Sequence, residues 1–452
     1  MKRSDRRPEV APPPSWRFGH PAQSWLDNGM QVLLNSRPGQ HVASVCLSLD
    51  TPLSGEPEHL EGVATITQRC LDEGTLAHPG ARFAEALEAI GASIEGSVGY
   101  SASQLFLDVP TAHLAEALQL LAEAVITPEL AADQVERHCE LRLAEIEQTL
   151  ASSARLAQQA FRTASIRPRY RASRLAGGNP TTVAAITPTA VAAYHQRTYR
   201  PDGATLIISG ELDATVLRLV EAAFGGWDQP VATQPEHQAP TRRRLHRWLI
   251  DRPGAVAADV RLGAFGIDRT DPRWADLQVA AHAVGGAFLS RLNKVLREER
   301  GFTYGVHLVN QPMRSGGLLA VQGSFRTEVV VEAISTAAAL IDLRHSPITE
   351  PEVAQAVSFH AGSAPLRFAT AQGVTQNLAG LVAAGVTADF IDANLVSLSH
   401  VTAASATDAL IELLPSEALS LVVVGDAASL KDPLADAGWA ATTYSATKLL
   451  HR

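Results

Sequence analysis

Apolar residues follow two different spacings along this 452-residue chain. Short runs such as "MQVLLN" and "SVCLSLD", within residues 30–50, predict strands. Residues 113–125, in which leucine and alanine recur every three or four positions, predict a helix. Each half of the chain opens with strands, continues with helices and closes on an apolar strand, "ATLIISG" or "LSLVVVG". This order predicts an α+β fold, in which helices pack on a mostly antiparallel sheet in each half.

The two halves also share a faint internal repeat. An Arg-Pro-Gly turn begins at Arg37 and again at Arg252, which are 215 positions apart (252 − 37 = 215). The apolar strands that close the halves end at Gly210 and Gly425, which are separated by the same distance (425 − 210 = 215). An equal offset at both ends of a half predicts two domains of similar structure.

The repeat sets the expected domain limits. We expect an N-terminal domain at residues 20–228 and a C-terminal domain at residues 246–452. Residues 229–245 between them are rich in proline and polar residues and have no periodicity, which is typical of a linker. Residues 1–19 are basic and contain three consecutive prolines without the apolar core of a signal peptide, so we expect a disordered leader.

Composition narrows the class of protein. Hydrophobic residues at 46% and charged residues at 19% are typical of a globular protein. The net charge is −9 and the basic residues are scattered, which argues against a nucleic-acid-binding surface. Three distant cysteines (Cys46, Cys70 and Cys139) argue against a disulfide framework. With no apolar run long enough to span a bilayer, we expect a cytoplasmic protein.

Residues 283–307 combine two side chains that suit a catalytic role. The pattern predicts a helix over residues 288–300, ended by Gly301 and followed by a strand. Three leucines share one face of this helix: Leu289, Leu292 and Leu296. Arg297 lies in the last helical turn, and Tyr304 follows seven residues later. A guanidinium and a phenol can both donate to a substrate carbonyl or oxyanion, although an isolated pair more often serves helix termination and packing.

This stretch resembles the second-domain signature of the pitrilysin/insulinase (inverzincin) family of zinc peptidases, which includes the mitochondrial processing peptidases. The signature has a Gly-Gly turn, a Ser-Arg-Leu helix, and an arginine and a tyrosine around a glycine: Gly285, Gly286, Ser290, Arg291, Leu292, Arg297, Gly301 and Tyr304. Residues 85–110 and 194–212 resemble two further family segments. The resemblance covers nearly all of the chain from Leu26 to Val424 and implies two homologous domains, each an antiparallel sheet packed with helices.

Active members of that family carry His-x-x-Glu-His on the first helix of the first domain. Histidines four residues apart share a helix face and can bind one Zn²⁺, while the glutamate acts as general base. In "EGVATITQRCLDEGT" (residues 61–75) the three positions hold Thr65, Gln68 and Arg69. A neutral amide cannot act as a general base, and a guanidinium stays protonated. We therefore expect these to be degenerate positions, with no metal or other cofactor in this chain.

A downstream helix of the family supplies a third metal-binding carboxylate. Glu140 and Glu145 fall in that region and, without histidine partners, are expected to be surface or network charges. Arg69 would then place a fixed positive charge near the lost metal position, within reach of Glu140 or Glu145.

The family often builds its working unit from two chains, one with the zinc helix and one with the Arg/Tyr pair. The resemblance therefore implies that this chain, inactive alone, is the non-catalytic subunit of a heterodimeric zinc metalloendopeptidase that processes peptides or leader sequences. Arg297 and Tyr304 would bind the scissile carbonyl, and zinc would belong to a homologous partner with His-x-x-Glu-His. Substrates would be unstructured peptides that add to a sheet edge. Two alternatives stay open: a structural core subunit and a peptide-binding module without catalysis.

Overall fold

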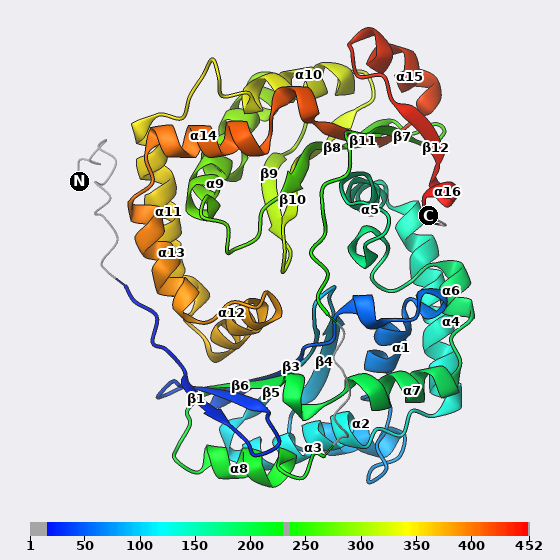
Figure 1. The fold of residues 1–452 in the computed structure, drawn as a ribbon, viewed down its shortest axis with the longest axis vertical. Helices are drawn as coiled ribbons and strands as arrows, with labels where there is room; N and C mark the ends of the chain where they lie inside the picture. Colours follow the sequence, from blue (N-terminus) through cyan, green and yellow to red (C-terminus); the bar gives the residue numbers. More distant parts are fainter. Residues whose placement is uncertain (1–15, 229–235, 451–452) are drawn as a thin grey trace, which may run out of the picture.

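The computed structural model describes residues 16–228 and 236–450. It contains two six-stranded sheets, one from each half of the chain (Figure 1). The strands of the first sheet are β1 (Ala22–Trp25), β2 (Gln31–Ser36), β3 (Val42–Leu49), β4 (Ser93–Val98), β5 (Ser103–Pro110) and β6 (Ala204–Gly210). Those of the second are β7 (Arg247–Asp251), β8 (Ala257–Gly266), β9 (Val306–Pro312), β10 (Gly317–Arg326), β11 (Ser420–Gly425) and β12 (Thr442–Ser445).

Helices of several lengths surround both sheets. Those of the first half are α1 (Val63–Arg69), α2 (Ala81–Ala89), α3 (Leu114–Ile126), α4 (Ala132–Ala151), α5 (Ser153–Ser165), α6 (Pro180–Ala184), α7 (Pro188–Thr198) and α8 (Val216–Phe224). Those of the second half are α9 (Trp274–Ala281), α10 (Val330–Ile341), α11 (Glu350–Arg367), α12 (Ala371–Ala383), α13 (Asp389–Ser399), α14 (Ala403–Leu413), α15 (Ala427–Asp436) and α16 (Ala446–Leu450), with two π-helical turns, η6 (His282–Gly286) and η7 (Asn293–Glu299).

The two sheets have the same strand order around their centres. The first runs β1-β2-β6-β3-β5-β4 and the second β12-β7-β11-β8-β10-β9. β2 is parallel to β6 and β7 is parallel to β11, while the pairings from there to β4 and β9 are antiparallel. The predicted two-domain α+β fold is therefore confirmed, with sheets that are mixed instead of antiparallel throughout.

The repeated turns and strand ends meet in space. The backbone N–H of Arg37 donates to the carbonyl of Gly210 at 2.6 Å, and the N–H of Arg252 donates to the carbonyl of Gly425 at 2.8 Å. Both bonds continue a parallel strand pair, β2–β6 in the first sheet and β7–β11 in the second. The offset of 215 (252 − 37) read from the sequence thus corresponds to the same hydrogen bond made once in each half.

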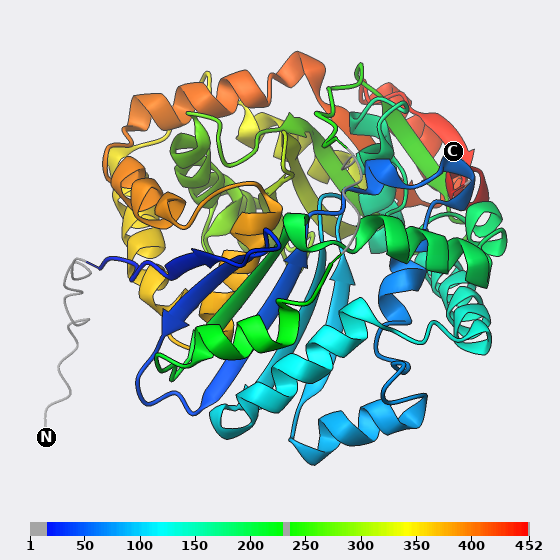
Figure 2. The same cartoon turned by 60° about the horizontal axis from the view of Figure 1, so that its bottom comes forward.

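Each sheet has one face covered by helices of its own half. In the first sheet Val45, Leu47 and Leu206 pack toward helices that include α3 and α8. Figure 2 shows these helices lying along the outer side of the sheet. Because neighbouring side chains of a strand point to opposite faces, the residues between them, such as Cys46 and Ile207, face the other way.

The opposite faces are covered by an exchange of helices between the halves. α12, from the second half, packs Val374 and Leu378 against Leu33, Cys46 and Ile207 of the first sheet. α5, from the first half, packs on β8 and β11 of the second sheet. Its apolar side chains form one cluster with that sheet: Leu156, Ala157, Ala160, Phe161, Trp248, Ile250, Leu318 and Val422. Each half therefore contributes a helix to the hydrophobic core on the other half's sheet (Figure 1).

The expected leader and linker are only partly described. Residues 1–15 and 229–235 lie outside the described residues. At the end of the expected leader the structure differs from the prediction, because Phe18 is buried and its ring lies 4.8 Å from that of Phe368. In the expected linker, His237 is hydrogen-bonded to Asp50 at 2.6 Å. The domain limits at residues 228 and 246 stay a prediction. Across the described ranges, no helix has the length and apolar character that crossing a membrane requires.

Candidate functional site

A buried carboxylate holds the start of α1, the helix that carries the degenerate positions. Gly62 precedes the helix with φ +103°, which favours glycine. Oε1 of Glu56 accepts hydrogen bonds from the backbone N–H groups of Gly62 (2.9 Å) and Ala64 (3.1 Å). These are free donors at a helix N-terminus, where a negative charge is stabilised. Glu56 therefore takes the place of a capping side chain for α1.

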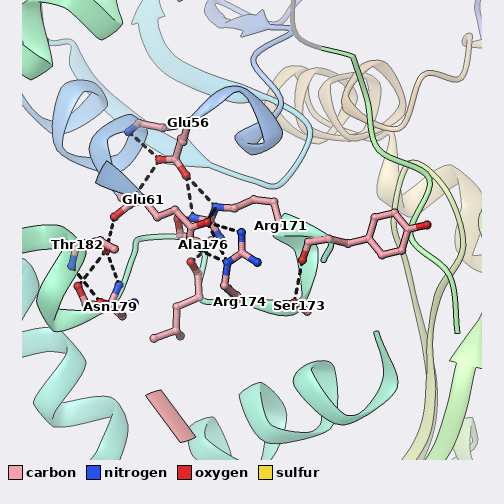
Figure 3. A network of polar contacts seen from close by, with 12 residues as sticks. Glu56, Glu61, Arg171, Ser173, Arg174, Ala176, Asn179 and Thr182 are labelled. Carbon is pink, nitrogen blue, oxygen red and sulfur yellow. Dashed lines mark hydrogen bonds and ion pairs between the residues drawn. The ribbon is translucent and has the colours of Figure 1, made fainter. Parts of the chain in front are cut away.

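Two arginines fix that carboxylate and its neighbour (Figure 3). Oε2 of Glu56 accepts from Nε and Nη2 of Arg171 at 3.0 and 2.8 Å, and Arg171 also donates to the carbonyls of Leu175 and Ala176. Nε of Arg174 donates to both carboxylate oxygens of Glu61, at 2.9 and 3.0 Å. Burial raises the pKa of Glu56, although Arg171 and the backbone donors oppose that rise. The network anchors α1 against residues 171–176.

None of the three degenerate positions on α1 is exposed, and Gln68 is buried. Arg69 is the one that contacts α4. Nη2 of Arg69 donates to Oε2 of Glu145 at 2.9 Å, so the expected contact is made with Glu145. Glu140, the other expected neighbour, is exposed on α4. Thr65 is half-buried, one turn before Arg69. The two positions expected for histidine therefore hold a hydroxyl group and a guanidinium group. The guanidinium places a fixed positive charge there.

The carboxylate that faces this helix is held by two guanidinium groups. Oε2 of Glu145 also accepts from Nη1 of Arg142 at 3.1 Å. Burial alone would raise the pKa of Glu145, but the hydrogen bonds from Arg69 and Arg142 outweigh it and lower the pKa. A zinc ion needs neutral imidazole, thiolate or carboxylate donors, and this set does not fit one. Within residues 16–228 and 236–450, no group of three or more histidine, cysteine, aspartate or glutamate side chains is arranged to hold a metal ion.

Gln68 lies against the open edge of the first sheet. β4 is the last strand in that sheet, and its outward side chains are exposed. A Cβ atom added at Gly96 of β4 would lie 1.3 Å from Nε2 of Gln68, so the amide occupies the space that any larger residue at 96 would need. Gly96 therefore allows α1 to approach the edge strand closely. The sequence offered no signal for this contact, because the two residues are 28 positions apart (96 − 68 = 28).

Arg297 is held by its own turn in the second half. It lies in η7, where its Nη2 donates to the carbonyl of Phe288 at 2.9 Å and its Nε donates to Glu298 at 2.8 Å. Its guanidinium lies 4.0 Å from the centroid of the Phe288 ring. Phe288 itself is 75% exposed. These contacts fix the direction of a guanidinium that stays near the surface.

Tyr304 is fully exposed in the turn before β9. The predicted strand begins later than expected, at Val306, and Gly301 ends the helix with φ +62° as expected. The helix also begins later than predicted, at residue 291, which leaves Leu289 exposed while Leu292 and Leu296 are buried. The side chains of Arg297 and Tyr304 make no hydrogen bond with each other in the described part of the chain.

Two further residues position this turn and were not singled out from the sequence. Oδ1 of Asn293 accepts from the N–H of Val306 at 3.1 Å, which joins η7 to β9. Glu352 of α11 accepts from Nε and Nη2 of Arg291, each at 2.7 Å. Burial would raise the pKa of Glu352, but the bonds from Arg291 and Thr349 lower it to about 2. The arginine of the Ser-Arg-Leu motif thus has a structural partner that only the fold reveals.

The expected Gly-Gly turn has a packing reason. Gly285 lies at the end of η6 beside β9, and a Cβ atom there would lie 2.3 Å from the backbone nitrogen of Leu308. Any other residue would force the helical turn and the strand apart. The turn therefore serves the close approach of η6 to β9, next to the strand that follows Tyr304.

Two family models match the chain over most of its length. Residues 31–173 match "Insulinase (Peptidase family M16)", and residues 185–358 match "Peptidase M16 inactive domain". An uncharacterized zinc protease of Mycobacterium tuberculosis (strain H37Rv) is 25% identical over 339 residues, which cover 74% of this chain and 76% of that protein. An uncharacterized zinc protease of Bacillus subtilis is 20% identical over 297 residues, covering 66% of this chain and 71% of that protein.

Solved structures share the fold. A peptidase M16 inactive domain from Pseudomonas fluorescens has a TM-score of 0.80 at 21% identity and covers 90% of this chain and 98% of its own. A chain of complex III from Candida albicans has a TM-score of 0.78 at 14% identity and covers 93% and 100%. With family models that match residues 31–173 and 185–358, the chain belongs to the insulinase (M16) family of peptidases.

Proposed function

We propose that the chain is the non-catalytic subunit of a heterodimeric zinc metalloendopeptidase that processes peptides or leader sequences. The observation that carries the proposal is the ion pair between Arg69 and Glu145. In this pair, a side-chain cation stands at the position where active family members would bind the metal. The same chain keeps Arg297 and Tyr304 in the second half. A pair of chains in which each supplies one part of the site explains why the two features occur together.

Arg297 and Tyr304 act as hydrogen-bond donors to the peptide in this proposal. The phenol of Tyr304 is fully exposed. Nη1 of Arg297 makes no hydrogen bond in the described residues, whereas its Nε and Nη2 are occupied. Both groups would donate to the scissile carbonyl oxygen in the partner's metal site and stabilise the oxyanion as the tetrahedral state forms. The partner would be a homologous chain with His-x-x-Glu-His.

The open edge of β4 offers the substrate a place to bind. An unstructured peptide can add as a strand to an exposed sheet edge, where main-chain hydrogen bonds hold it with little dependence on sequence. β4 pairs with β5 on one side only, and Gln68 lies against it. The substrate would therefore extend along this edge, beside α1.

Reconstitution tests the proposal. The chain is co-expressed with a homologous His-x-x-Glu-His chain from the same genome, and cleavage of an unstructured peptide is measured for each chain alone and for the pair. Cleavage by the pair, with none by this chain alone, is the expected result. A stable pair whose activity equals that of the partner alone would contradict the proposal.

A second candidate is a structural core subunit or a peptide-binding subunit without a peptidase role. The likeness in fold to a chain of complex III from Candida albicans favours this candidate. One measurement distinguishes the two candidate functions. A structural subunit supports assembly whether or not residues 297 and 304 keep their donors, whereas the first proposal requires both donors for turnover.

A further inference from the structure

A separate pocket of about 340 Å³ lies in the second half, among α9, α11, α12 and α13. These helices contact one another at the same side of the molecule (Figure 1). Guanidinium groups come from Arg269 and Arg367, amides from Asn377 and Asn394, and an aromatic wall from Trp274. The volume falls in the range of small-molecule sites, and the mixture of apolar walls with a few polar groups is typical of them.

The pocket carries an uncompensated positive charge. Its lining includes two arginines and, among the described residues, no aspartate or glutamate. Arg269 forms no ion pair within residues 16–228 and 236–450, and burial lowers its pKa. Its guanidinium lies 5.7 Å from the centroid of the Trp274 ring. Since the whole chain has a net charge of −9, this positive pocket is a local feature that favours an anion.

The wall of the pocket also lacks hydrogen-bond partners. Nε1 of Trp274, Oε1 of Gln278 and both ring nitrogens of His360 are buried without a partner in the described residues. Burial, with His282 and Arg367 nearby, lowers the pKa of His360 to about 4. The backbone of Gln278 opposes this decrease, although it forms no hydrogen bond of ordinary geometry with the His360 ring. The ring is therefore neutral near pH 7. Native interiors pair nearly all such atoms, so a bound water or another polar group is expected to reach these atoms beside the pocket.

We propose that this pocket binds a small organic anion, with a carboxylate or phosphate group on an apolar or aromatic body. Arg269 holds the oxyanion, and the amide of Asn394 donates to it, whereas the amide nitrogen of Asn377 already donates to the carbonyls of Arg367 and Gly373. Trp274, Phe390 and Leu395 contact the body. The pocket lies apart from both the Arg69–Glu145 pair and the Arg297/Tyr304 turn, so this inference does not depend on the peptidase proposal.

Titration with matched probes tests the charge preference. Benzoate, benzylamine and inorganic phosphate are titrated into the purified full-length chain by isothermal titration calorimetry. Benzoate is expected to bind with a Kd of about 1 mM, as suits a probe of its size, and benzylamine about 10-fold or more weakly. Equal binding of benzoate and benzylamine, or no benzoate binding, overturns the proposal. If inorganic phosphate binds as tightly as benzoate, the proposed contribution of an organic body to binding is overturned.

Variants locate the site. Arg269→Gln is expected to weaken benzoate binding by about 10-fold or more, because a charge-assisted hydrogen bond is lost. Arg269→Lys keeps the charge and is expected to retain part of the binding. Arg218→Gln, at an exposed position of α8, is the matched control and leaves Kd unchanged. A circular dichroism spectrum like that of the native chain shows that each variant is folded. Unchanged binding by folded Arg269→Gln overturns the assignment.

Discussion

Nη2 of Arg69 lies 2.9 Å from Oε2 of Glu145, so a guanidinium of α1 pairs with a carboxylate of α4. The motif comparison predicts that Arg69 takes the position of the second histidine of active family members. The positive charge that a metal ion would supply at this position is instead supplied by the Arg69 side chain. The glutamate keeps a cationic partner, and α1 stays attached to α4 without any ion.

Zinc content follows from that pair. The chain purified alone is expected to carry well below one zinc per chain, because Thr65, Gln68 and Arg69 do not supply the required donors. The triple variant Thr65→His, Gln68→Glu and Arg69→His is expected to bind zinc with Glu145 as third protein donor. Inductively coupled plasma mass spectrometry measures both. Stoichiometric zinc in the native chain would contradict the prediction, and adding Glu145→Ala to the triple variant is the control.

Loss of Arg69 is expected to cost little stability. The side chains of Arg69 and Glu145 are 28% and 40% exposed, and Arg142 still pairs with Glu145 when Arg69 is removed. Arg69→Ala is therefore expected to lower the free energy of unfolding by about 0.5–1 kcal/mol, as for partly exposed pairs. Urea unfolding of Arg69→Ala, Glu145→Gln and the double variant gives the coupling. A loss several times larger would show that the pair is a main support of α1.

The Arg171–Glu56 pair is expected to behave differently, because it is buried. The side chains of Arg171 and Glu56 are 4% and 0% exposed. Arg171→Met leaves the buried Glu56 without its cationic partner, and is expected to lower the free energy of unfolding by about 3–5 kcal/mol. Arg344→Met, which breaks an exposed pair with Asp342, should leave the unfolding midpoint unchanged. Equal midpoints for the two variants would show that α1 does not depend on this network.

The Arg291–Glu352 pair predicts a dependence of stability on pH. Because the pKa of Glu352 is lowered from 4.5 to about 2, the folded state favours the carboxylate. Its contribution, at most about 3 kcal/mol and reduced by solvent screening of this partly exposed pair, is present above pH 4.5 and is lost as the pH falls toward 2. Unfolding free energies of the native chain and Glu352→Gln should therefore converge between these pH values. A constant difference down to pH 2 would exclude the linkage.

Measurements of turnover test whether Arg297 and Tyr304 act as hydrogen-bond donors to the substrate. In the reconstituted pair, Tyr304→Phe or Arg297→Ala is expected to lower kcat by about 10²-fold, as for a lost oxyanion donor. Tyr170→Phe removes a phenol hydroxyl close to the linker and serves as the matched control. If both variants assemble with the partner and turn over like the native pair, the structural candidate is favoured.

The sequence predicted much of the fold because its strongest signals are local or repeated. The offset shared by Arg37 and Arg252 predicted two similar halves, and the structure shows the same hydrogen bond in both. The contact of Arg69 with α4 could be anticipated because opposite charges were placed on two helices of one family motif. Its partner could not be chosen between Glu140 and Glu145 until the register of α4 was known.

Other features depend on tertiary packing and leave no local signal. Leu289 fits the helical apolar pattern but is 66% exposed, because the helix begins only after Ser290. The contact of Gln68 with Gly96 and the π-helical turns η6 and η7 also depend on how distant segments approach. Periodicity reports which face of a helix is apolar and carries no information about which sheet that face will cover.

The exchange of α5 and α12 makes the two halves obligate companions. A nick in the polypeptide between them would leave two fragments, each holding a helix that the other's sheet needs. Such fragments are expected to remain associated and to elute as one species under native conditions. Either fragment synthesised alone would leave one apolar face of its own sheet exposed to water, and is expected to aggregate unless the other fragment is present.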